Sequence, residues 1–238
     1  MNIQERIEAF NTNNAPFHIV DHEDGRFSLC LPLDFLSEEY HPYCQDAFNA
    51  YAAEIGEPAY NKHGLRLHGN GYEWEAAFRQ AFADDPNIGR ILFDSEAGGF
   101  FCDCDDLSLI EDFGKRFKEI CEDTERFVPI VSEGIKNAKE REAAEERLLR
   151  TVKGQLMRHP DCTFDIMTPD GIVTVAPQDG KKLLCGETPQ IKINGTYFAA
   201  CELLEQEVTD FQMDLFDRKH IKLVTIEPEQ ELAPTLTM

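Results

Sequence analysis

The chain has 238 residues and contains 45 Asp and Glu against 23 Lys and Arg, which gives a formal net charge of -22. Nucleic acids and anionic membrane surfaces are bound chiefly through Lys and Arg, so we expect a chain this acidic to bind neither. Its field would instead speed encounters with cationic proteins. Residues 1–150 contain 31 of the acidic and 15 of the basic side chains, so most of the negative charge belongs to that part. Acidity that serves only solubility is the alternative explanation.

The apolar content bounds the class of protein. Hydrophobic residues make up 42% of the chain and include 17 Phe, which is enough for one large core or two modest ones. No segment reaches the roughly 18 apolar residues of a membrane span, and MNIQERIEAF lacks the apolar run of a signal peptide. We therefore expect a cytoplasmic protein. Its 8 Cys are expected to be free and mostly buried, because a chain with this much core does not need disulfides.

The order of patterns predicts an α+β protein with two domains, residues 1–150 and 151–238. In the first, a small, mostly antiparallel sheet is expected to pack against helices. Its predicted elements are a hairpin, a helix, a loop, a helix and a second hairpin, over residues 16–32, 39–55, 61–71, 72–83 and 88–104. Asp105 or Asp106 is expected to cap the next helix. A further helix starts at Thr124 and continues as a solvated helical linker, with opposite charges at helical spacing.

The second domain is predicted to be a small α+β unit whose role the sequence does not indicate. TFDIMTPDGIVTVAP predicts a hairpin that turns at Asp170-Gly171. QDGKKLLCGE predicts a short helix closed by Gly186, and QIKINGTYFAA a strand and turn at Asn194-Gly195. ELLEQEV is expected to be a short helix and HIKLVTIEP a final strand, while residues 231–238 should fray.

The segment from Gly69 to Asp106 has the most distinctive pattern. It combines a glycine-rich turn, an aromatic amphipathic helix and a hairpin whose strands and exit are rich in carboxylates. Crowded carboxylates repel one another, and a cationic partner would relieve that cost. We predict an acidic face with aromatic anchors that binds such a partner. The predicted partner-binding residues are Tyr72, Glu73, Glu75, Asp94, Glu96, Phe101, Asp103, Asp105 and Asp106.

Simpler explanations compete with this prediction. A solvated loop with two helix caps would account for the carboxylates without any partner. Tyr72, Trp74 and Phe78 cannot all share one helical face, so at least one ring should be buried, and we expect Trp74 to be in the core.

GNGYEWE and FDSEAGGFFCDCDD, followed by the helix LSLIEDFGKRFKEICED, resemble the immunity protein 51 family of bacterial polymorphic toxin systems. The resemblance covers roughly residues 15–135. The matching residues are Gly69, Asn70, Gly71, Tyr72, Trp74, Glu75, Phe93, Asp94, Glu96, Ala97, Gly98 and Phe100. Residues 41–68, before the motif, form a longer region than a minimal family member is expected to have.

This resemblance implies an α+β domain that is encoded beside a toxin and neutralises it in the cytoplasm of the producing cell. The implied partner is the cognate secreted toxin, and the negative charge of the chain predicts that this toxin is basic, such as a nuclease. The protein would then be a stoichiometric inhibitor rather than an enzyme, and no cofactor is expected.

A metal-dependent or thiol enzyme is the alternative. Cys102 and Cys104 should face one side of a strand, and Cys121 could be a third ligand, but the spacing falls short of a zinc knuckle. The hairpin carboxylates lack the loop of an EF-hand. The common hydrolase, P-loop and dinucleotide-binding motifs are absent from the sequence. A protein-interaction adaptor is a third reading.

Overall fold

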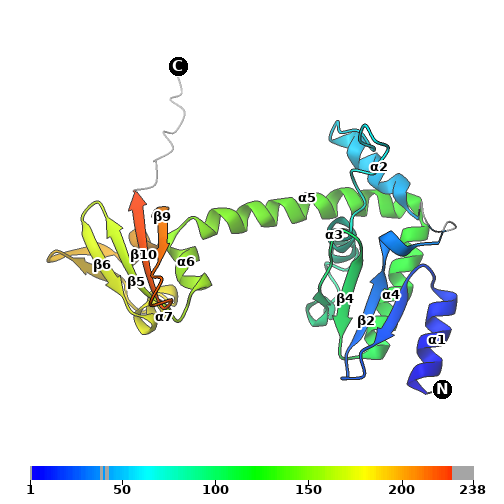
Figure 1. Cartoon of the computed structure of the whole chain (residues 1–238), viewed down its shortest axis with the longest axis horizontal. Coiled ribbons are helices and arrows are strands. Elements are labelled where there is room, and N and C mark those ends of the chain that lie inside the picture. Colours follow the sequence, from blue (N-terminus) through cyan, green and yellow to red (C-terminus); the bar gives the residue numbers. More distant parts are fainter. Residues whose placement is uncertain (1, 38–39, 41–42, 227–238) are drawn as a thin grey trace. The chain divides into compact units, whose positions relative to one another are not determined.

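The computed structural model describes residues 2–37, 40 and 43–226 (Figure 1). The chain folds as two units, Met1–Glu140 and Arg141–Met238, and helix α5 (Thr124–Leu149) runs from the first into the second. Both units combine helices with antiparallel-rich sheets, which confirms the predicted α+β class. Within the described residues, no helix has the length and apolar character needed to span a membrane.

A four-stranded antiparallel sheet organises the first unit. Its strand order is β1-β2-β4-β3, with β1 (His18–Asp21), β2 (Phe27–Leu31), β3 (Leu92–Phe93) and β4 (Phe100–Cys104). The register places Leu29 opposite Cys102 and Ser28 opposite Asp103. Burial alternates along β4, because successive side chains of a strand point to opposite faces. The sheet therefore has an inner face that contains Cys102 and an outer face that contains Asp103.

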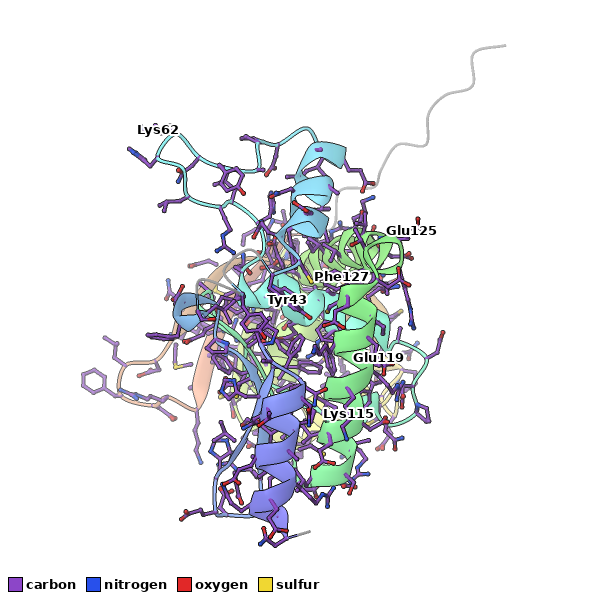
Figure 2. The ribbon with its side chains drawn as sticks, turned by 90° about the vertical axis from the view of Figure 1, so that its right-hand side faces the viewer. Tyr43, Lys62, Lys115, Glu119, Glu125 and Phe127 are labelled. Atoms are coloured by element: carbon purple, nitrogen blue, oxygen red, sulfur yellow. The ribbon has the colours of Figure 1, made fainter. Side chains whose placement is uncertain are left out.

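Helices α1 (Ile3–Asn13), α3 (Gly71–Ala81) and α4 (Leu107–Glu122) contact this sheet (Figure 1). Helix α4 buries Ile110, Phe113 and Phe117 at helical spacing. Lys115 and Glu119 lie on the exposed side of the same helix (Figure 2). The α4 N-terminus is capped by Asp106, whose side chain accepts from the amides of Ser108 and Leu109, as the sequence predicts.

Trp74 is the centre of the first unit's core, where only 1% of it is exposed. Its ring stacks on Tyr43 at 6.0 Å and meets Phe48 and Phe127 at 5.1 and 5.5 Å. These partners come from the segment before α2 (Gln45–Glu54), from α2 itself and from α5. Figure 2 shows Tyr43 and Phe127 in this interior. The prediction that Trp74 is a core residue is confirmed.

The second unit has its own core and two sheets. The larger sheet has the order β6-β5-β10-β9, in which β10 is parallel to β5 and the other pairs are antiparallel. Its strands are β5 (Thr163–Thr168), β6 (Gly171–Val175), β9 (Glu207–Met213) and β10 (His220–Ile226). A hairpin of β7 (Gln190–Ile193) and β8 (Thr196–Ala199) and the helices α6 (Val152–Arg158), α7 (Pro177–Leu184) and α8 (Ala200–Leu204) complete it.

Several predicted boundaries are wrong. The helix expected from residue 39 begins at Gln45, and Ile88–Arg90 is a 3-10 helix (η2) rather than part of a strand. In ELLEQEV the helix ends at Leu204, and β9 follows because Glu207 pairs with Ile226. Helix α1 was not predicted, since Ile7 and Phe10 are its only two buried residues. Residues 39, 41 and 42 of the predicted helix and the expected frayed segment 231–238 lie outside the described residues.

Candidate functional site

The GNGYEWE segment (residues 69–75) and the AGGF turn (residues 97–100) contact each other in the fold. Asn70 caps α3 by accepting from the Glu73 amide at 3.1 Å. The next residue, Gly71, directs its amide to the carbonyl of Ala97 at 3.4 Å, in the turn between β3 and β4. That turn is closed by paired backbone contacts between Glu96 and Gly99 at 3.0 and 3.2 Å. The start of α3 is therefore seated on the tip of the second hairpin.

The outer face of the sheet is partly open to solvent. Leu92 is 66% exposed and Val20 is 38% exposed, whereas Ile19 on the inner face is 2% exposed. Asp94 lies opposite Phe101, whose carbonyl accepts from the Asp94 amide at 3.1 Å. By strand alternation, Asp94 shares this face with Leu92. We define the outer face as the side chains of His18, Val20, Ser28, Cys30, Leu92, Asp94, Phe101 and Asp103.

The five hairpin carboxylates do not crowd into one cluster, and this part of the sequence prediction is wrong. Glu96 lies before β4 and Asp105 after it, and four steps along a strand span roughly 13 Å. Asp105 and Asp106 instead both accept from Arg90, at 3.4 and 3.2 Å. Hydrogen bonds from the Leu109 amide and then from Arg90 lower the pKa of Asp106. Asp94 and Asp103 remain together on the outer face.

The three residues predicted on α3 have different surroundings. Tyr72 is 58% exposed and borders the 96–99 turn, so its ring is available to a partner. Glu75 forms an ion pair with Arg79 at 2.8 Å, and the Arg79 guanidinium lies 3.8 Å from the centre of the Phe93 ring. Glu73 turns inward, and its carboxylate accepts from the Gly69 amide at 2.5 Å. Glu73 therefore holds the loop before α3.

Three hydrogen-bonded polar side chains form a row that begins at the turn of the first hairpin and ends on the outer face of the sheet. The Ser28 hydroxyl donates to Asp103 at 2.5 Å, and His22 Nε2 lies 2.5 Å from the same hydroxyl. In a hydrolase triad, His would accept the proton of Ser while the carboxylate holds His. Here the Ser28 hydroxyl donates its hydrogen bond to the Asp103 carboxylate, so His22 can only donate to Ser28. The row fixes Asp103 and is not a nucleophile with its base.

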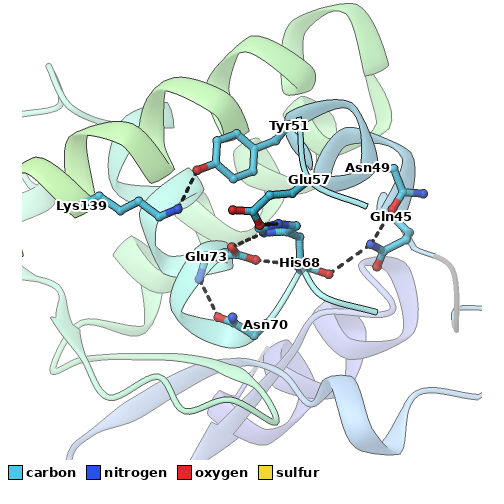
Figure 3. Close-up of polar contacts among 9 residues, drawn as sticks. Gln45, Asn49, Tyr51, Glu57, His68, Asn70, Glu73 and Lys139 are labelled. Carbon is cyan, nitrogen blue, oxygen red and sulfur yellow. Dashed lines mark hydrogen bonds and ion pairs between the residues drawn. The ribbon is translucent and has the colours of Figure 1, made fainter. Parts of the chain in front are cut away.

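Sequence patterns gave no sign of a polar network around His68, which is 8% exposed (Figure 3). Its Nδ1 lies 2.8 Å from Glu73 and its Nε2 lies 3.1 Å from Glu57. Gln45 donates to the His68 carbonyl at 3.1 Å. The network ties α2, the loop after it and α3 together. A lone His in a loop has no motif, so only the fold could reveal it.

A pocket of about 620 Å³ opens beside this network. Its walls come from the start of α2, from residues 60–70 and from the 3-10 helix Leu33–Phe35 (η1), with Ala97 at one edge. Exposed Asp34 and Asp46 lie at its margin, and Arg66 donates to Gln45 at 3.1 Å within it. The mixture of charges gives the pocket no marked preference for cations or anions.

The thiols of the hairpin are buried. Cys102 and Cys104 face the core, and burial raises the pKa of both. On the outer face, burial raises the pKa of Cys30 to about 12. Across the described residues, no three His, Cys, Asp or Glu side chains come together as a metal ion would require.

No family model, curated protein or solved structure matches the chain.

Proposed function

We propose that the protein is an immunity protein, which binds a cognate secreted toxin in the cytoplasm of the producing cell and inhibits it. The resemblance of residues 15–135 to the immunity protein 51 family supports this proposal. So does the net charge of -22, which favours a basic partner.

The observation that carries the proposal is the outer face of the first sheet. Leu92, Val20 and Phe101 offer apolar surface there, and Asp94 and Asp103 lie among them. An apolar centre that excludes water, with charged groups around it, is the usual anatomy of a protein interface. Asp103 is already held by Ser28, so a basic side chain would meet a carboxylate that needs no reordering.

Tyr72 offers a further aromatic contact near the tip of the hairpin. It is exposed on α3, next to the turn that contains Glu96. An aromatic anchor supplies contact area at low entropic cost, while the carboxylates control the rate and selectivity of association. Asp105 and Asp106 are occupied by Arg90 and are not needed for binding in this proposal.

The proposal requires that a secreted toxin is encoded beside this chain, and the test uses the C-terminal domain of that toxin. We expect a one-to-one complex that abolishes the toxin's activity, with an association rate that falls steeply as salt is added. Leu92→Arg should weaken binding at least tenfold, because it places bulk and the wrong charge in the interface. Leu215→Arg, the same change at a residue that is 90% exposed in the second unit, should not. Equal loss from both variants, or an association rate that is independent of salt, would refute the proposal.

A further inference from the structure

Two cysteines lie side by side where α2 begins and α4 ends. The Cys44 thiol donates to the backbone carbonyl of Cys121 at 3.3 Å, although the two residues are 77 positions apart in sequence. Burial, and after it the neighbouring Cys44 side chain, raise the pKa of Cys121. We infer that Cys44 and Cys121 form a dithiol site that is converted to an intramolecular disulfide by small disulfide oxidants. This inference does not depend on the proposed function.

The local geometry directs Cys44 toward α4. Cys44 immediately precedes α2 and has a left-handed backbone, with φ of 52°, which non-glycine residues seldom adopt. Its side chain makes no capping hydrogen bond to α2, which a residue at this position often does. The thiol instead contacts the last turn of α4. Helix capping therefore does not explain a cysteine in this conformation, whereas contact with Cys121 gives it a partner.

A small pocket gives reagents access to the two cysteines. A pocket of about 190 Å³ is lined by both cysteines together with Thr124 and Phe127. Cys44 is half-buried and Cys121 is 3% exposed, so a reagent in the pocket reaches Cys44 first. The Tyr43 hydroxyl is buried nearby and has no partner with hydrogen-bond geometry in the described part of the chain. A hydroxyl in that position can donate to a thiolate as it forms.

The chemistry proceeds in two exchanges. Cys44 attacks one sulfur of the oxidant RSSR, a new S–S bond joins Cys44 to that RS group as the S–S bond of RSSR breaks, and the other RS⁻ leaves and takes up the Cys44 proton. Cys121 then attacks the Cys44 sulfur, the second RS⁻ leaves, and it takes up the Cys121 proton. The two protein thiols lose two electrons and two protons, and RSSR becomes two RSH. Burial raises the pKa of Cys121, so the second exchange is the slow step and should accelerate as pH rises.

The other cysteines show whether exposure or contact with a second thiol would select the site of oxidation. Cys102 and Cys30 lie on adjacent strands, but the register places Cys102 opposite Leu29 and Cys30 opposite Phe101, so their side chains point to opposite faces. Cys162, Cys185 and Cys201 of the second unit are more accessible than Cys121, but within the described residues none of them contacts another thiol. Exposure alone would therefore oxidise the second unit first, whereas contact selects the pair Cys44 and Cys121.

The experiment incubates the full chain with glutathione disulfide and then alkylates the thiols that remain free. After digestion, mass spectrometry identifies which cysteines are alkylated and which are joined. We expect a peptide pair joined between Cys44 and Cys121 with the loss of two hydrogens, reversed by dithiothreitol. The disulfide would close a long loop, so the unfolding transition of the first unit should rise by about 5–10 °C. The variant with Cys162, Cys185 and Cys201 all changed to Ser should behave in the same way.

Cys44→Ser should lose both the linked peptide and the shift in Tm, and Cys121→Ala provides a second test should Ser disturb the helix cap. Glutathione that remains attached to Cys44 in the wild type would overturn the inference, because it would mean that Cys121 cannot reach the mixed disulfide. Failure of Cys44 to react, or a Tm shift that survives in Cys44→Ser, would overturn it as well.

Discussion

A β-carbon added to Gly71 would lie 1.9 Å from the carbonyl oxygen of Gly99 and 2.2 Å from that of Glu96. The first residue of α3 therefore packs directly on the backbone of the hairpin turn. No side chain fits between them, and backbone atoms cannot swing away as a flexible side chain can. This contact explains why the two glycine-containing motifs, nearly 30 residues apart, act as one structural unit.

Gly71→Ala should destabilise the first unit by about 2 kcal/mol or more, because α3 must move off the turn. Gly89→Ala is the matched control, since a β-carbon there meets no atom within 4 Å. It should change stability by less than about 1 kcal/mol. Urea unfolding of both variants measures the difference. Equal stability of the two variants would contradict the prediction, because it would mean that the 96–99 turn can move to admit a β-carbon at little cost.

Trp74→Ala should cost about 3–5 kcal/mol, since it empties a buried site surrounded by aromatic rings. Tyr72→Ala, two residues earlier on the same helix, should change stability by at most about 0.5 kcal/mol because its ring is exposed. Its effect should appear in toxin binding instead. Thermal unfolding and a binding titration on both variants separate the two roles. A large loss of stability in Tyr72→Ala would contradict the assignment of its ring to the surface.

His68→Ala should destabilise the first unit by about 1–3 kcal/mol, because Glu57 and Glu73 lose the partner between them. Lys139, which donates to Tyr51 at 3.0 Å, lies in the same neighbourhood but does not replace the lost ring (Figure 3). His63→Ala changes an exposed histidine of the same loop and should have little effect. Guanidinium unfolding of the pair is the measurement. Similar stability of both variants would show that His68 is not what holds the loop.

The pKa of Asp106 is lowered in the folded protein, chiefly by the Leu109 amide and then by Arg90. A lowered pKa contributes stability that is present above the unfolded value of about 3.9 and is lost as pH falls through the folded value. Asp106→Asn keeps a capping oxygen but not the charge. The advantage of the wild type over this variant should thus be constant near neutral pH and fade in the acid range below about pH 4.

Asp94→Asn is the control for this experiment, because Asp94 caps no helix. Thermal unfolding between neutral and acid pH records both differences. A wild-type advantage over Asp106→Asn that persists unchanged to the lowest pH would contradict a role for the ionised carboxylate.

Much of the local structure could be predicted from sequence because it depends on neighbouring residues. The Asp106 cap, the first hairpin and the apolar period of α4 each follow from a few adjacent side chains. The burial of Trp74 could be predicted because Tyr72, Trp74 and Phe78 cannot all lie on one face of a helix, so at least one ring had to be buried. The α+β class then followed from the order of these elements.

The tertiary structure decided where those pieces meet. Strand alternation and the length of β4 separated Glu96 from Asp105. Arg90 forms ion pairs with Asp105 and Asp106 after β4, so the expected cluster of carboxylates did not form. The His68 network and the contact of Cys44 with Cys121 join residues from different elements. Such contacts depend on how elements pack, and no spacing along the chain records them. The sequence by itself determined elements and charge, whereas packing determined which charges and thiols became neighbours.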